Sequence, residues 1–214
     1  MHRPVRVTAP EALPISLEEV KKALRVDSAD DDEMLTSLIQ SAVDHYEGWT
    51  GVLGICLVEQ TWRQAFDRFE QCLRLPLGPV IAVDGVKTRD SAGTETQIPS
   101  TDYAVETDAA GRSYVRFVDG FTMPSDTALR SAISVEYRAG WPIVDDKPTV
   151  PADILTAIIA RVQIGYEQTA TDAGQTIANM ERALIAKLSI GVVTGPLIGS
   201  QKGPLPLVAS GQRA

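Results

Sequence analysis

Two successive helices are predicted by residues 16–51, which read SLEEVKKALRVDSADDDEMLTSLIQSAVDHYEGWTG. Ser16 and Glu19 form a capping box, in which the serine hydroxyl and the glutamate carboxylate each accept a backbone N–H at the helix start. A short helix follows and ends near Val26. Its apolar residues share one stripe at helical spacing: Leu17, Val20 and Leu24.

The second helix has the strongest periodic pattern in the sequence. The acidic residues 30–33 stand at its start, where the helix dipole favours negative charge, and glycines 48 and 51 end it. The i, i+3, i+4, i+7 repeat indicates an amphipathic helix, with apolar positions Met34, Leu35, Leu38, Ile39, Ala42, Val43, Tyr46 and Trp49. We expect the face from Leu35 to Tyr46 to form the spine of a helical domain.

Between residues 55 and 138 the pattern changes to short, alternating apolar runs. Turns at 90–93 and 108–111 each end in glycine, as hairpin loops do. Strands are predicted at 57–66, 73–75, 80–88, 94–98, 103–106, 114–118 and 132–137. Such strands indicate an antiparallel sheet, a small sandwich or an open barrel.

Helical spacing returns after the prolines at 148 and 151. A third helix is predicted over 153–168 and a fourth over 176–189. Beyond residue 191, glycines and prolines exclude regular helix, yet apolar residues recur and no acidic residue follows Glu181. Candidate docking residues on the fourth helix and tail are Ile177, Met180, Leu184, Leu188, Leu197, Ile198, Leu205, Leu207 and Val208.

These observations predict an α+β fold. A helical domain of four helices, formed by residues 16–51 and 150–190, receives an inserted antiparallel β lobe at 55–138. Residues 1–15 are an extended leader and 191–214 an extended tail. We expect the first three helices and the sheet to close the core, so that a chain cut after Gly174 still folds. The alternative is that the fourth helix completes its own bundle and a floppy end follows.

Composition narrows the functional class. The 214 residues are 44% hydrophobic, and the net charge of −8 argues against a groove that tracks a phosphate backbone. No apolar run reaches the length of roughly 18 residues that a membrane helix needs. The N-terminus lacks the apolar core of a signal peptide, so we expect the chain to stay in the cytoplasm.

Catalytic and metal-binding signatures are not found. His2 and His45 are the only histidines, and Cys56 and Cys72 lie too far apart in the sequence for a CxxC motif. The acidic run fails as a calcium loop because position 3, counted from Asp27, is alanine. We therefore expect no enzyme activity, no metal and no cofactor. A small enzyme or acidic ligand-binding domain built around His45 remains one alternative.

A nucleic-acid-binding regulator is the other alternative. Six aromatic residues offer possible stacking platforms for bases: Trp49, Trp62, Tyr103, Tyr114, Tyr137 and Trp141. Arginines 63, 112, 116 and 138 accompany them, but acidic residues are interspersed. Packing within the two lobes explains the aromatic residues better than base stacking.

The segments quoted above resemble a known family. The run 16–27, the acidic cluster with Met34 and Leu35, and the sequence 47–51 are similar to the N-terminal signature of tailed-phage head–tail connector (adaptor) proteins. The stretches 75–80, 102–103 and 137–142, with Val150-Pro151 before a helix, resemble the subfamily with a β insertion. Gene transfer agents, which are phage-derived particles, use such adaptors.

The resemblance implies a structural role without enzyme activity. It implies a ring of about twelve copies that attaches to the portal protein and continues the DNA channel towards the next neck or tail component. DNA would pass without specific binding, since acidic walls do not grip phosphates. The protein would assemble in the bacterial cytoplasm and then reside in the particle neck, with no membrane partner.

Overall fold

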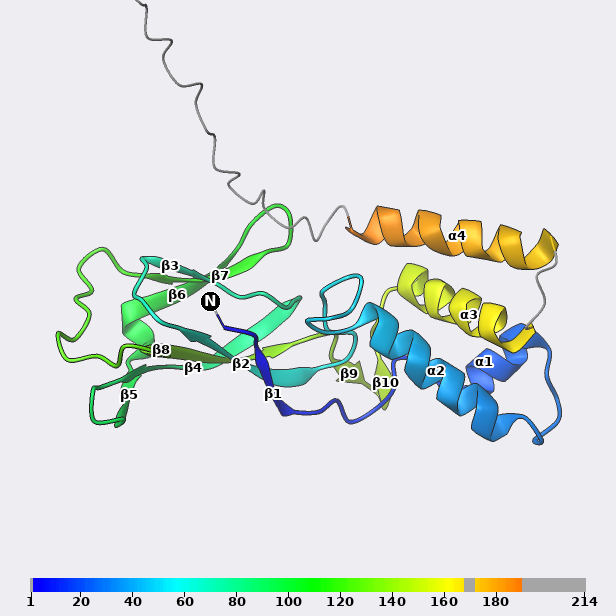
Figure 1. Ribbon diagram of the computed structural model, residues 1–214, viewed down its shortest axis with the longest axis horizontal. Helices are drawn as coiled ribbons and strands as arrows, with labels where there is room; N and C mark the ends of the chain where they lie inside the picture. Colours follow the sequence, from blue (N-terminus) through cyan, green and yellow to red (C-terminus); the bar gives the residue numbers. More distant parts are fainter. Residues whose placement is uncertain (1, 168–171, 190–214) are drawn as a thin grey trace, which may run out of the picture.

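The computed structural model describes residues 2–167 and 172–189, which form two lobes side by side (Figure 1). One lobe holds four helices, α1 (Leu17–Leu24), α2 (Asp32–Tyr46), α3 (Ala152–Glu167) and α4 (Asp172–Ser189). The other holds two antiparallel sheets, whose strands come from the segment between α2 and α3 except for one strand from the N-terminal leader. The predicted α+β fold, with a β lobe inserted between two pairs of helices, is confirmed.

The capping box at the start of α1 is present. The backbone N–H of Glu19 donates to Ser16 Oγ over 3.3 Å, and the backbone N–H of Ser16 donates to Glu19 Oε2 over 3.0 Å. The helix stops at Arg25, which takes a left-handed conformation with φ of 58°. These local bonds set the direction in which the chain enters α2.

The buried face of α2 is the one that its periodicity predicts. Its fully buried side chains are Leu35, Ile39, Ala42, Val43 and Tyr46. Leu38 is partly buried and packs close to Gly165 of α3. A Cβ atom at that glycine would lie only 2.8 Å from a methyl carbon of Leu38. Met34 and Trp49 were predicted on this face but are 41% and 42% exposed. Met34 stands in the first turn at the edge of the face, and Trp49 lies beyond the last residue of α2.

The β lobe has two antiparallel sheets. One is five-stranded in the order β1-β2-β8-β4-β5, and the other is three-stranded in the order β3-β7-β6. Each predicted strand is found, with these bounds: β2 (Gln60–Phe66), β3 (Cys72–Arg74), β4 (Val80–Arg89), β5 (Glu95–Ile98), β6 (Tyr103–Thr107), β7 (Ser113–Phe117) and β8 (Ile133–Ala139). The two sheets share one core, to which Trp62, Val86, Val115 and Phe117 contribute.

Three short strands were not predicted. Residues of the leader form β1 (Val5–Thr8), which pairs with β2 and makes one edge of the five-stranded sheet. His2, in the predicted extended leader, lies with its Nε2 2.6 Å from Asp67 Oδ1. β9 (Ile143–Val144) and β10 (Lys147–Pro148) form a small hairpin before α3. All three have two to four residues, too few for a periodic signal.

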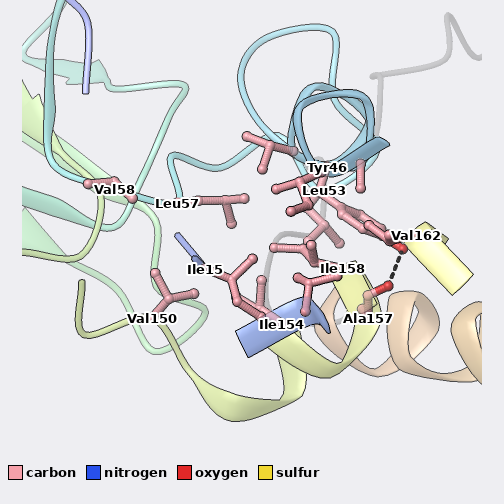
Figure 2. Packing of buried hydrophobic residues seen from close by; sticks show 14 of the residues in the cluster. Ile15, Tyr46, Leu53, Leu57, Val58, Val150, Ile154, Ala157, Ile158 and Val162 are labelled. Atoms are coloured by element: carbon pink, nitrogen blue, oxygen red, sulfur yellow. Dashed lines mark hydrogen bonds between the residues drawn. The ribbon is translucent and has the colours of Figure 1, made fainter. Parts of the chain in front are cut away.

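The helical lobe has its own hydrophobic core. Side chains of α2 and α3 meet those of Leu53 and Leu57, which belong to the connection towards β2, and Ile15 and Val150 close one end (Figure 2). Within the described residues, no helix is both long and apolar enough to cross a membrane.

Glu47 joins the two lobes at the end of α2. Its Oε1 accepts hydrogen bonds from the backbone N–H of Leu57 and from the side-chain amide of Gln60, each over 2.7 Å. Burial raises the pKa of the Glu47 carboxyl above its ordinary value, although these two hydrogen bonds oppose the shift. The carboxylate therefore serves as a structural hydrogen-bond acceptor, and burying its negative charge lowers the stability of the folded protein.

We expect Glu47→Gln to change the pH dependence of stability. Because the pKa is raised in the folded state, the folded protein binds more protons than the unfolded chain, and Glu47 lowers stability as pH rises above about 4.5. Gln keeps the acceptor oxygen but does not titrate. The unfolding free energy of Glu47→Gln relative to the parent should therefore increase from pH 4 to pH 7, measured by urea denaturation. The same difference at both pH values would contradict this explanation.

Candidate docking surfaces

The fourth helix, α4, lies against α3 along the outside of the helical lobe (Figure 1). Leu184, Ile185 and Leu188 are partly buried and pack against the helical core. Ile177 is half-buried, whereas Met180 is 47% exposed. The expectation that three helices close the core and leave the α4 stripe without a partner is therefore wrong for Leu184 and Leu188. The core of the described residues needs α4 because α2 and α3 leave an apolar surface between them.

A buried polar network fixes α4 in place. Glu181 of α4, only 6% exposed, accepts a hydrogen bond from the Tyr46 hydroxyl over 2.6 Å. The Arg161 guanidinium donates to the same carboxylate oxygen over 2.9 Å. Burial, and then the bond to Glu181, raise the pKa of Tyr46 far above its ordinary value, so the hydroxyl remains a donor. The network thus ties α4 to both α2 and α3.

Replacing Glu181 by Ala should loosen α4. The change leaves the buried Tyr46 hydroxyl without its shortest partner, and a loss of about 1–3 kcal/mol of unfolding free energy is expected. Met180→Ala, on the neighbouring exposed position, should cost less than about 0.5 kcal/mol. Equal losses in denaturant titrations of the two variants would show that the network does not hold the helix.

The other candidate docking residues, Leu197, Ile198, Leu205, Leu207 and Val208, lie outside the described residues. In the described part of the chain, Leu184 and Leu188 pack on the helical core and keep part of their surface, whereas Ile177 and Met180 are not among the residues that pack on it. They lie on the half of α4 nearer its start. Leu188 lies at the other end of the helix, where the chain runs on towards the tail.

An apolar groove of about 300 Å³ lies between the two lobes beside Leu188. The helical lobe supplies Ile154 and Leu188 to its wall, and the connection between β8 and β9 supplies Trp141. The β lobe supplies the run 75–79 and the tip of the β6–β7 hairpin at residues 110–113. The sequence positions of the Leu-Pro-Leu-Gly-Pro run and Trp141 do not predict this groove, because only the packing of the two lobes makes them neighbours.

Arg74 adds a charged group to this groove. Its Nε is buried and has no hydrogen-bond partner among the described residues. Arg112, which also lines the groove, is paired with Asp108 over 2.8 Å. The groove therefore has a mainly apolar lining with two arginine side chains among its residues.

The arginines considered for nucleic-acid binding are engaged in ion pairs. Arg63 pairs with Glu136, Arg112 with Asp108, Arg116 with Glu106, and Arg138 with both Glu59 and Asp84. Each guanidinium thus has a carboxylate within 3.1 Å. Of the aromatic residues, Trp62 and Tyr137 are buried in the β core. The paired arginines and the buried aromatic rings therefore do not favour a phosphate-binding or base-stacking surface.

His45 does not form part of a catalytic group in the described structure. Its ring contacts the ring of Tyr46 edge-on at 5.0 Å, and burial, followed by the positive charge of Arg161, lowers its pKa. Cys56 is buried in the β core and Cys72 is half-buried. Across residues 2–167 and 172–189, no three His, Cys, Asp or Glu side chains are grouped to hold a metal ion.

Comparison with known proteins gives a match to one family model and to several solved structures. Residues 14–107 match the family model of phage gp6-like head-tail connector proteins. No curated protein sequence matches the chain. A chain in the solved "Neck of empty GTA particle computed with C6 symmetry" shares the fold with a TM-score of 0.72 and 22% identity, over 92% of this chain and 98% of that chain.

Two further structures of gene transfer agent (GTA) particles show the same fold. A chain in the "Virion of native gene transfer agent (GTA) particle" has a TM-score of 0.69 at 21% identity, over 92% of this chain and 97% of that chain. A chain in the "Neck of native GTA particle computed with C12 symmetry" has a TM-score of 0.69 at 20% identity, over 92% and 98%. The resemblance to head–tail connectors with a β insertion is confirmed.

Proposed function

We propose that this protein is a structural head–tail adaptor, built into the neck of a phage or gene transfer agent particle. The observation that carries the proposal is the match of residues 14–107 to the head-tail connector family. The fold supports it over nearly the whole length, since the similar chains come from GTA necks and a virion. A small enzyme or ligand-binding domain is not favoured, because His45 packs edge-on against Tyr46, whose hydroxyl belongs to the structural network with Glu181 and Arg161.

The working form of the protein is proposed to be a ring of its own copies. Two of the similar neck structures were computed with C6 and C12 symmetry, and repeated copies around an axis form a closed ring through heterologous contacts. A ring of about twelve copies would sit below the portal. It would assemble in the bacterial cytoplasm and then remain in the particle.

The portal-docking element is proposed to be the outer face of α4 together with the tail. Ile177 and Met180 retain exposed surface on α4, and the tail carries Leu197, Ile198, Leu205, Leu207 and Val208. A ring presents this element once per copy, so weak individual contacts add up through effective concentration. The opposite side of the ring would meet the next neck or tail component.

DNA is proposed to pass through the ring without specific binding. The net charge of −8 and the ion-paired arginines of the β lobe leave little basic surface in the described part of the chain. A gel-shift assay of the isolated protein near physiological salt should give no complex with duplex DNA tighter than about 1 µM. A tighter complex with a steep salt dependence would instead favour a nucleic-acid-binding regulator.

Co-sedimentation with the portal protein of the same particle tests the proposed partner. The full chain should move with the portal as a complex whose mass corresponds to a ring of copies. A matched variant, Met180→Asp, should weaken the complex, because it places a charge on the exposed apolar position of α4. Ser37→Asp, on the exposed side of α2, serves as the control. Failure of the full chain to bind the portal would contradict this assignment.

A further inference from the structure

The apolar groove between the lobes opens where α4 ends. Leu188, in the last turn of α4, is part of its wall together with Ile154 and Trp141. The chain that continues beyond Ser189 therefore starts at the rim of the groove. No long connection is needed for the next residues to enter it, since each extended residue spans roughly 3.3–3.6 Å.

We propose that residues 190–198 of the isolated protein dock into this groove of their own subunit. The segment reads IGVVTGPLI and has no charged residue. Its Val and Leu side chains suit a lining made of Ile55, Leu75 and Leu77. Burial of these side chains stabilises the docked form in proportion to the apolar area removed from water.

Residues 190–198 hold two glycines and a proline, which disfavour helix and suit an extended segment laid along the groove.

The tail of the same subunit is favoured over that of a neighbouring copy. Its attachment at Leu188 gives it a high effective concentration at the groove even when the protein is dilute. The same segment is part of the proposed portal-docking element, so the groove would keep it on its own subunit until the portal competes for it. Competition by the portal rests on the proposed function. Docking in the isolated protein does not, so it can be refuted without a portal and without affecting the proposed function.

Disulfide trapping tests the contact in the isolated full chain. In a Cys72→Ser background, Leu197→Cys is combined either with Ala110→Cys, which lines the groove, or with Ala109→Cys, an exposed neighbour outside it. Ala109 and Ala110 are adjacent in the sequence, so a tail that does not dock should reach both at similar rates. We expect the monomeric disulfide to form about tenfold faster with Ala110→Cys. Equal rates, or disulfides only between two chains, would overturn the proposal.

Hydrogen exchange provides a readout that needs no new cysteine. The full chain is compared with a chain ending at Ser189, which retains all of α4. Peptides covering residues 74–79 and 110–113 should exchange about tenfold more slowly in the full chain. Peptides of β5, far from the groove, should not differ. The same exchange at the groove in both chains would rule out docking of the segment there.

Discussion

Ile39→Ala is expected to lower the unfolding free energy by about 2–5 kcal/mol. Ile39 is 1% exposed and lies in the middle of α2, among the core side chains that α3 and the connection to β2 contribute. Removing its side chain leaves a cavity that these neighbours fill only in part, which adds to the lost burial. A loss of this size is a large fraction of the stability of an ordinary domain.

Met34→Ala is the matched control on the same helix. Met34 is 41% exposed, so the change should cost less than about 0.5 kcal/mol. Both variants replace a large apolar side chain of α2 by alanine, which has the highest helix propensity, so neither loss can be attributed to a weaker helix former. Chemical denaturation followed by circular dichroism measures the difference. A cost for Ile39→Ala no larger than that for Met34→Ala would show that the buried face of α2 lies elsewhere.

Removing residues 190–214 is expected to abolish attachment to DNA-filled heads while leaving the folded body intact. The cut after Ser189 keeps Glu181, Leu184 and Leu188, which pack in the helical lobe, so the body should stay folded and lose only the modest stabilisation that the docked segment adds. Losing the tail removes one contact per copy, and a ring multiplies that loss. Cells that produce the shortened chain should accumulate heads without tails, counted by electron microscopy.

The position of the cut makes this experiment specific. A cut after Gly174 would also remove Glu181 and its bonds to Tyr46 and Arg161, so it would test folding as much as docking. Tailed particles in normal number with the chain ending at Ser189 would place the docking element outside the tail. Unfolding of the shortened chain would instead show that the body needs the tail in order to fold.

The helices were predictable because their side-chain pattern is local. The capping box at Ser16 and the spacing from Leu35 to Tyr46 each specify a helix and its buried face without reference to distant residues. The partner of α4 was not predictable in this way. Its stripe shows that one face is apolar, but which surface covers it depends on a pairing between Glu181 and Tyr46, 135 residues apart.

The strands of the β lobe were predictable individually, whereas their assembly was not. Alternation identifies β2 and β8, but the strand order and the split into two sheets depend on long-range pairing. The groove was not predictable from the sequence for the same reason. Its lining residues come together only when the two lobes pack, as Ala110, Trp141 and Leu188 do. The resemblance to head–tail connectors supplied the functional class, since no catalytic residue pattern marks a structural ring protein.

A three-dimensional reconstruction of the neck of the purified particle tests the central claim most directly. The two-lobed chain should fit repeated density in a ring directly below the portal, with α4 on the side that faces the portal. Mass spectrometry of the same particles should find the chain as a stoichiometric component. Absence of the chain from intact, tailed particles, or density at the neck that its fold does not fit, would contradict a head–tail adaptor.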